Sequence, residues 1–159
     1  MPKKAYVEKS TARLAAVQAL YQEAISQTPF PQLIKDFSQK LAMDTTRDEQ
    51  TEETSEKDHI LFTHLVEETL RYKTQIDKVI QEHLPKGWTF DRVELLLIII
   101  LEVALYELLY EQSMHPNMIV SEYVDIANAF YGGKETAFVN GLLNEVAKNP
   151  WKEGPKSTS

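Results

Sequence analysis

The residues of this sequence best suited to chemistry are cations near its N-terminal end. Lys9 and Arg13 are four residues apart, a spacing that puts both on one face of a helix. With Lys3 and Lys4, they give residues 1–22 a net charge of +3. Cations clustered at the start of a helix can bind phosphate groups, so this arm is a candidate nucleic-acid site. An ordinary charged terminus is the alternative interpretation.

A second candidate is Phe138, which opens a predicted helix shortly after a Gly-Gly-Lys turn. If exposed beside Lys134, the ring could stack on an unpaired base. Packing into the core beside Leu142 is the alternative, which the pattern of residues alone favours. Gly141 lies in the same predicted helix, where glycine costs about 1 kcal/mol relative to alanine. Close helix packing, or a partner approaching the backbone, would account for it.

No motif in the sequence indicates catalysis. The signatures of dinucleotide, phosphate-loop, serine-hydrolase and zinc-protease sites are missing. No cysteine is present to act as a nucleophile, metal ligand or disulfide partner. His59 and His64 are five residues apart, unlike the pair of a helical metal site. The sequence therefore predicts no enzyme, no metal site and no cofactor, and surface positions for the four histidines, His59, His64, His83 and His115.

Helices must position these residues, because helical hydrophobic spacing dominates the sequence and no strand pattern is visible. Pro31, Pro85 and the Gly132-Gly133 pair separate the predicted segments. The fold class predicted is all-α, a compact bundle of six to seven helices. The predicted helices cover residues 11–26, a segment from Pro31, 58–84 with a bend near Tyr72–Thr74, 91–112, a segment holding 119–130, and 135–148.

The most apolar run, Leu95 to Leu101, is bracketed by Glu94 and Glu102 and is far shorter than the roughly 20 residues of a membrane span. The N-terminus lacks the apolar core of a signal peptide, so we expect a cytoplasmic protein without a membrane partner. The run is interpreted as core. Any exposed part would favour self-association, and a homodimer is predicted in some conditions. A buried Glu102 would need a cationic or hydrogen-bonding partner.

Charge is unevenly distributed along the 159 residues. The net charge of −7 argues against a protein that coats nucleic acid non-specifically. Residues 44–58 hold seven acids and two bases, a net charge of −5, and are predicted to form a solvated loop. The remainder is close to balanced, which permits a small local site. We expect one domain over residues 1–148, followed by a polar tail over 149–159.

Three segments together resemble the NusB family of bacterial transcription antitermination factors. They are RLAAVQALY at 13–21, VALYEL at 103–108, and residues 122–143, where Phe-Val-Asn-Gly at 138–141 is the most specific part. The resemblance spans about residues 10–26 and 60–148, and residues 44–58 look like a lineage-specific loop. It implies an all-helical fold of two small helical subdomains.

The resemblance also implies a function. Members of the family pair with the ribosomal protein NusE, and the pair binds the boxA element of nascent single-stranded RNA, notably in ribosomal RNA operons. The complex then joins the antitermination complex on RNA polymerase. By this resemblance, Phe138 matches an RNA-facing phenylalanine and Tyr21 a tyrosine near the partner-binding surface. The RNA-binding residues predicted from charge and resemblance together are Lys3, Lys4, Lys9, Arg13, Lys134 and Phe138.

The sequence departs from the family pattern at several positions. Ser10 and Thr11 stand where the family has arginines, which predicts weaker RNA binding or more reliance on the partner. Glu102 stands where the central helix usually has an arginine. These departures keep open a protein-interaction or assembly factor with weak intrinsic RNA affinity. A NusB-like domain also precedes a ribosomal RNA cytosine methyltransferase, but the chain has neither a catalytic cysteine nor room for a cofactor-binding α/β domain.

Overall fold

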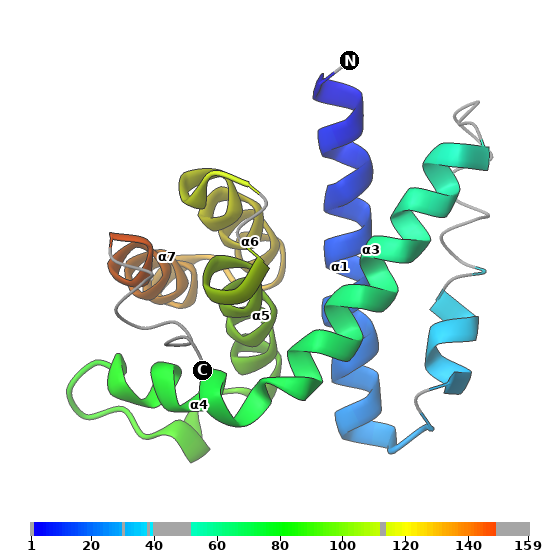
Figure 1. Ribbon diagram of the computed structural model, residues 1–159. Helices are drawn as coiled ribbons and strands as arrows, with labels where there is room; N and C mark the ends of the chain where they lie inside the picture. Colours follow the sequence, from blue (N-terminus) through cyan, green and yellow to red (C-terminus); the bar gives the residue numbers. More distant parts are fainter. Residues whose placement is uncertain (1, 30, 38, 40–51, 112–113, 149–159) are drawn as a thin grey trace, which may run out of the picture. The chain divides into compact units, whose positions relative to one another are not determined.

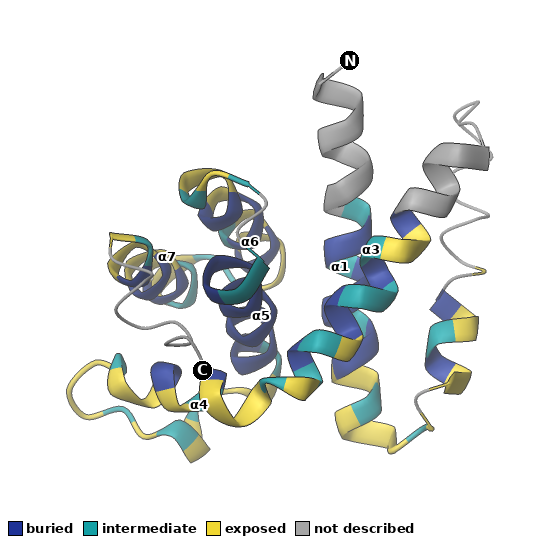
Figure 2. Ribbon diagram, in the orientation of Figure 1, coloured by how far each residue is buried: buried dark blue, intermediate teal, exposed yellow. Residues whose placement is uncertain are grey.

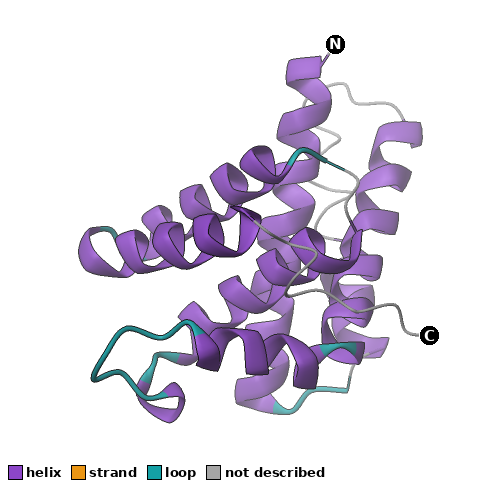
Figure 3. Ribbon diagram, turned by 60° about the vertical axis from the view of Figure 1, so that its left-hand side comes forward, coloured by secondary structure: helices purple, strands orange, loops and turns teal. Residues whose placement is uncertain are grey.

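A computed structural model describes residues 2–29, 31–37, 39, 52–111 and 114–148, although the side chains of 2–10 and 52–57 fall outside that description. Within these ranges the chain is helical and holds no strand, which confirms the all-α prediction (Figure 3). Residues 31–37 are helical. The other elements are α1 (Pro2–Ser26), α3 (Glu52–Arg71), α4 (Lys73–Glu82), the 3-10 turn η1 (Phe90–Arg92), α5 (Leu95–Tyr106), the π-helical segment η2 (Glu107–Glu111), α6 (Pro116–Phe130) and α7 (Gly133–Lys148) (Figure 1).

The chain forms two compact units, residues 1–67 and residues 68–159, and the boundary falls within α3. Two units agree with the two helical subdomains that the family resemblance implies. In the first unit, α1 buries a stripe of mostly small apolar side chains. Phe37 stacks on Phe62 of α3, with ring centroids 5.9 Å apart, which joins the short helix at 31–37 to α3. The buried apolar residues of α1 are Ala12, Ala15, Ala16, Val17, Ala19 and Leu20.

In the second unit, α5 is the central helix. It packs against α4, α6 and α7, and α6 packs along α7. Every residue from Leu97 to Tyr106 is buried (Figure 2). An α-helix that is apolar nearly all round must be covered on every side. The interpretation of the apolar run as core is therefore confirmed from Leu97 to Leu101, whereas Leu95 at its start is 40% exposed. Across the described residues, no helix is both long and apolar enough to span a bilayer.

The long helical stretch of the sequence breaks at Tyr72, between α3 and α4, within the bend that was predicted. The Tyr72 ring stacks on Tyr110 at 4.1 Å between centroids and lies 6.2 Å from Tyr106. Tyr110 belongs to η2, where the backbone widens from α-helical to π-helical spacing. The hydroxyl of Tyr106 donates to Glu111 at 2.7 Å. Burial, followed by this hydrogen bond, raises the pKa of Tyr106.

A carboxyl group is buried in the apolar helix α5. Glu102 is 4% exposed, and its Oε2 lies 3.6 Å from the ammonium of Lys73. The same ammonium donates to Asp77 at 2.8 Å. Burial, with Asp77 nearby, raises the pKa of Glu102 from 4.5 to about 9, although Lys73 acts in the opposite direction. Glu102 thus has a cationic partner, Lys73, as was predicted for a buried carboxyl group at this position.

Three predicted boundaries were wrong. The first helix was predicted from residue 11, but α1 already begins at Pro2. The stretch at 44–58 was predicted to be a loop, but α3 begins at Glu52, and residues 44–51 lie outside the described residues. Glutamate and lysine are good helix formers, so polar composition alone does not exclude a helix. The predicted helix at 91–112 is divided: η1 holds 90–92, and α5 begins only at Leu95, because Val93 and Glu94 have extended backbone dihedrals.

Candidate functional site

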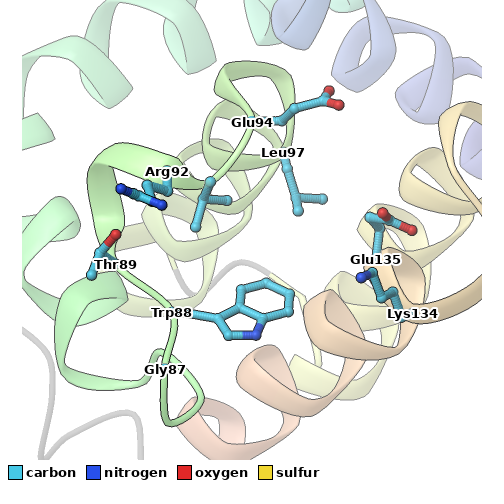
Figure 4. Close-up of a pocket in the computed structure, with 9 residues that line it drawn as sticks. Gly87, Trp88, Thr89, Arg92, Glu94, Leu97, Lys134 and Glu135 are labelled. Atoms are coloured by element: carbon cyan, nitrogen blue, oxygen red, sulfur yellow. The ribbon is translucent and has the colours of Figure 1, made fainter.

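The candidate site is a pocket of about 300 Å³ in the second unit. Three segments line it: the loop between α4 and α5, the first turn of α5 and the first turn of α7. Figure 4 shows the indole of Trp88 lying between the loop and α7, with the side-chain nitrogen of Lys134 directed toward it. The lining residues are Gly87, Trp88, Thr89, Arg92, Val93, Glu94, Leu97, Lys134 and Glu135.

The loop that carries Trp88 follows from its local sequence. Pro85 ends the helical pattern after α4, since proline has no N–H to donate. Gly87 has φ of +90°, a backbone region that favours glycine. The backbone N–H of Trp88 donates to the carbonyl oxygen of Pro85 at 3.0 Å, which closes the turn. This tight turn leaves the indole pointing toward α7 (Figure 4).

Trp88 and Phe138 form one aromatic pair. Their ring centroids are 4.7 Å apart and their planes are inclined by 43°. Phe138 is 8% exposed and lies on the buried side of α7 with Val139 and Leu142, so the core interpretation of Phe138 holds. Trp88 is half-buried and lines the pocket. The aromatic surface open to a ligand here is therefore mainly that of Trp88.

The charges of the pocket lining balance. Arg92 and Lys134 are exposed cations, and Glu94 and Glu135 are carboxylates of the same lining. Glu94 is engaged, because the hydroxyl of Tyr131 donates to its Oε1 at 2.6 Å. Figure 4 places Arg92 with Thr89 on one side of the pocket and Lys134 with Glu135 on the other. A ligand with an apolar face and both donors and acceptors on its edges would match this lining.

The structure brings two of the predicted RNA-binding residues together. Lys134 and Phe138 lie one helical turn apart on α7, and both adjoin the pocket or its tryptophan. The sequence interpretation missed Trp88 and Arg92. A signal for Trp88 was available, because a tryptophan directly after Pro-Lys-Gly stands in a turn where a purely polar residue would suffice. No comparable signal distinguished Arg92 from other surface cations.

The predicted residues of the first unit have different surroundings. Arg13 is 2% exposed, so its guanidinium presents almost no surface to a phosphate, and its role in RNA binding stays a prediction. Lys3, Lys4 and Lys9 belong to α1, but their side chains are outside the described residues. Tyr21 is 38% exposed near the end of α1, as a partner contact requires, and its role also stays a prediction.

The four histidines and Gly141 are not among the residues that line the pocket. His59 and His115 are exposed, His64 and His83 are half-buried, and no cluster of potential metal ligands occurs in the part of the chain that the structure describes. Gly141 is exposed, and a Cβ added there would meet nothing within 4 Å. Close helix packing therefore does not explain this glycine. A partner near the backbone remains the other explanation that the sequence offered.

Comparison with known proteins identifies relatives over most of the chain. The NusB family model matches residues 10–148. A transcription antitermination protein NusB of Sphingopyxis alaskensis is 39% identical over 145 residues, which cover 91% of this chain and 95% of the relative. The protein of the same name from Novosphingobium aromaticivorans is 36% identical over 141 residues, covering 89% of this chain and 93% of the relative.

Solved structures share the fold. NusB of T. maritima superposes with a TM-score of 0.70 at 23% identity, covering 89% of this chain and 91% of the other. A structure of the antitermination factors NusB and NusE in complex with double-stranded RNA contains a chain that matches with a TM-score of 0.70 at 23% identity. That match covers 89% of this chain and 96% of the other.

Proposed function

This chain belongs to the NusB family, and we propose that it is an RNA-binding transcription antitermination factor rather than an enzyme. It acts with ribosomal protein NusE on the boxA element of nascent RNA, notably in ribosomal RNA operons. The observation that carries the proposal is the family match over residues 10–148, joined by relatives named for transcription antitermination. A structural neighbour that holds NusB, NusE and RNA together supports both partners.

The pocket of the second unit supports an RNA contact. It combines an aromatic ring with exposed Lys134 and Arg92, the groups that stack on bases and neutralise phosphates. Lys3, Lys4, Lys9 and Arg13 remain proposed contributors from α1. Arg13 belongs to the first unit and Lys134 to the second, and each is proposed as an RNA contact of its own unit.

NusE is the proposed protein partner, and Tyr21 a proposed contact with it. Tyr21 and Ile25 are four residues apart on α1 and are 38% and 61% exposed. Two large apolar side chains on one helix face are suited to a protein interface. Through NusE, we propose, the chain joins the antitermination complex on RNA polymerase.

The deciding experiment measures binding of a boxA oligoribonucleotide to the chain with and without purified NusE. We expect NusE to strengthen binding, a scrambled RNA of equal composition to bind weakly, and affinity to rise as salt is lowered, because phosphate contacts release counterions. Transcription in vitro through a terminator downstream of boxA then tests the consequence. Absence of any NusE effect, together with equal binding of boxA and scrambled RNA, contradicts the proposal.

A second candidate is an assembly factor with weak RNA affinity of its own, and it is supported by the burial of Arg13 and the acidic balance of the chain. It predicts binding of NusE with no gain in RNA affinity.

A homodimer is also proposed. Most of the apolar run is core, but its first residue, Leu95, is 40% exposed, and Met118 and Phe130 of the second unit are 44% and 43% exposed.

A further inference from the structure

We propose that the pocket beside Trp88 receives one unstacked base of the bound RNA, and that Trp88 supplies the ring on which this base stacks. The inference rests on the proposed function and refines it. Family resemblance assigns the RNA-facing ring to Phe138, whereas the geometry of this chain points to the residue that covers it.

The first step of the argument is accessibility. Phe138 is 8% exposed, and the indole of Trp88 lies 4.7 Å from it, centroid to centroid. Because Phe138 is buried and the indole of Trp88 packs against its ring, Phe138 is not accessible for a base to stack on. Trp88 is half-buried and lines the pocket of about 300 Å³, so part of its ring surface faces the cavity. Phe138 then acts as a positioning residue that supports the indole.

The second step is the size and chemistry of the cavity. Ligand pockets begin at about 300 Å³, a volume that suits one heterocycle rather than a folded nucleic acid. Leu97 and Val93 add apolar wall, and Thr89 and Glu135 offer a hydroxyl and a carboxylate to the polar edge of a base. Base–aromatic stacking accepts any base, while edge contacts of this kind select among them.

The third step separates a base from a bare phosphate. Two cations and two carboxylates line the pocket, so its formal charge is zero, which gives little attraction for an isolated anion. The cations are placed to contact the backbone on either side of an inserted base, since Figure 4 puts Arg92 and Lys134 on opposite sides of the pocket. A nucleotide within a strand satisfies the ring and both cations together.

The test is an abasic scan of the boxA oligoribonucleotide, with affinity for the chain in the presence of NusE measured by fluorescence anisotropy. We expect removal of one particular base to weaken binding to the unaltered chain about tenfold, as for loss of one stacked base. Trp88→Leu, which keeps an apolar cover over Phe138, should weaken binding to intact RNA about equally. The penalty for the missing base should then vanish, because the two changes remove the same interaction.

Two further variants serve as controls. Trp88→Tyr restores a ring and should recover most of the affinity, which a general loss of folding would not allow. Ile60→Ala removes an apolar side chain of α3 that is 59% exposed and outside the pocket lining, and should leave the whole abasic profile unchanged. If Trp88→Leu leaves every abasic penalty as it was, the inference is wrong although the proposed function stands. If the unaltered chain and NusE bind no boxA RNA, both fall.

A direct readout uses the tryptophans themselves. The chain has two, Trp88 and Trp151, so Trp151→Phe leaves Trp88 as the single reporter. With 5-fluorotryptophan in that variant, fluorine NMR observes only this residue, even when unlabelled NusE is present. We expect the resonance to shift on binding intact RNA and to stay near its free position with the RNA that lacks the critical base. An unshifted resonance at saturating RNA would overturn the inference.

Discussion

Lys134 is an exposed cation at the start of α7 and belongs both to the pocket and to the predicted RNA surface. Lys134→Gln should weaken RNA binding across sequences and make the negative slope of log affinity against log salt shallower by about 1, because one phosphate contact is lost. Binding titrations at several salt concentrations measure this. Lys148→Gln, at the other end of α7, is the matched control, and an equal loss in both variants would contradict a local contact.

The buried Glu102 makes stability depend on pH. Its pKa is raised from 4.5 to about 9, so between these values the folded chain holds a proton that the unfolded chain has released. The free energy of unfolding should therefore decrease as pH rises through this window, by up to about 1.4 kcal/mol per pH unit. Glu102→Gln should remove this component, and urea unfolding at pH 5 and pH 8 measures the difference between the two chains.

Other groups titrate in the same range, so the comparison needs a control. Glu145→Gln removes an exposed carboxylate of α7 and should leave the pH dependence as it is in the unaltered chain. Lys73 retains Asp77 at 2.8 Å in Glu102→Gln, so the ammonium keeps a partner there. Parallel pH profiles for the unaltered chain and Glu102→Gln would show that Glu102 does not carry the effect.

Some properties of single residues in the site could be predicted from the sequence, and others could not. Lys134 and Phe138 could be predicted, because a turn followed by a helix start places them one turn apart. Burial of Phe138 was the interpretation that the pattern of residues favoured. Its contact with Trp88, fifty positions earlier in the chain, could not be predicted, because only tertiary packing brings the two rings together. Likewise, spacing put Arg13 on a helix face but does not tell which face is buried.

The turn between α6 and α7 depends on backbone conformation. Gly132 and Gly133 have φ of +75° and +58°, in the region that side chains disfavour. Gly132→Ala should therefore lower the free energy of unfolding by about 1 kcal/mol, although its Cβ would meet nothing closer than the Asn128 side chain at 3.9 Å. Urea unfolding measures the change, and an unaltered midpoint would contradict a conformational cost.

Gly141 should respond in the opposite direction. It lies within α7, is exposed, and offers open space to a Cβ. Gly141→Ala should raise the free energy of unfolding by about 0.5–1 kcal/mol, because alanine loses less backbone entropy in a helix. The same urea measurement decides it, and destabilisation would mean that the helix does not tolerate the methyl group.

Among the elements, hydrophobic period located the segments that are helical, and a bend near Tyr72–Thr74 was predicted where α3 ends and α4 begins. The start of α5 was placed too early, because Asp91 is a good helix cap in sequence but lies within η1. The π-helical spacing at 107–111 has no signal in residue types, since the same hydrophobic side chains satisfy either helix.

At the scale of the whole molecule, self-association is the property that most needs measurement. Leu95 and Phe130 leave apolar surface on the second unit, and we expect at least partial dimerisation at high concentration. Sedimentation velocity over a concentration series measures this, and Leu95→Lys should shift the population toward monomer. A single monomeric species at every concentration would refute the dimer.

The net charge of the whole chain shows what composition can and cannot predict about a nucleic-acid site. A net charge of −7 argued against a protein that coats nucleic acid non-specifically, and −5 of it falls in residues 44–58. Composition could not locate a pocket whose four charged residues cancel, because such a site leaves no trace in a net charge. The two-unit division also came from family resemblance and not from hydrophobic period.

The stacked tyrosines at the break between α3 and α4 give the second unit an optical signature. Rings held 4.1 Å, 6.0 Å and 6.2 Å apart couple electronically and should yield a near-ultraviolet circular dichroism band that free tyrosine lacks. Tyr106 and Tyr110 lie four residues apart in the continuous stretch formed by α5 and η2, and Tyr72 packs on both from the break between α3 and α4. The contribution of Tyr72 to the band therefore reports assembled tertiary structure rather than helix content. This band is a measure of packing in the second unit that is independent of the Trp88 signal.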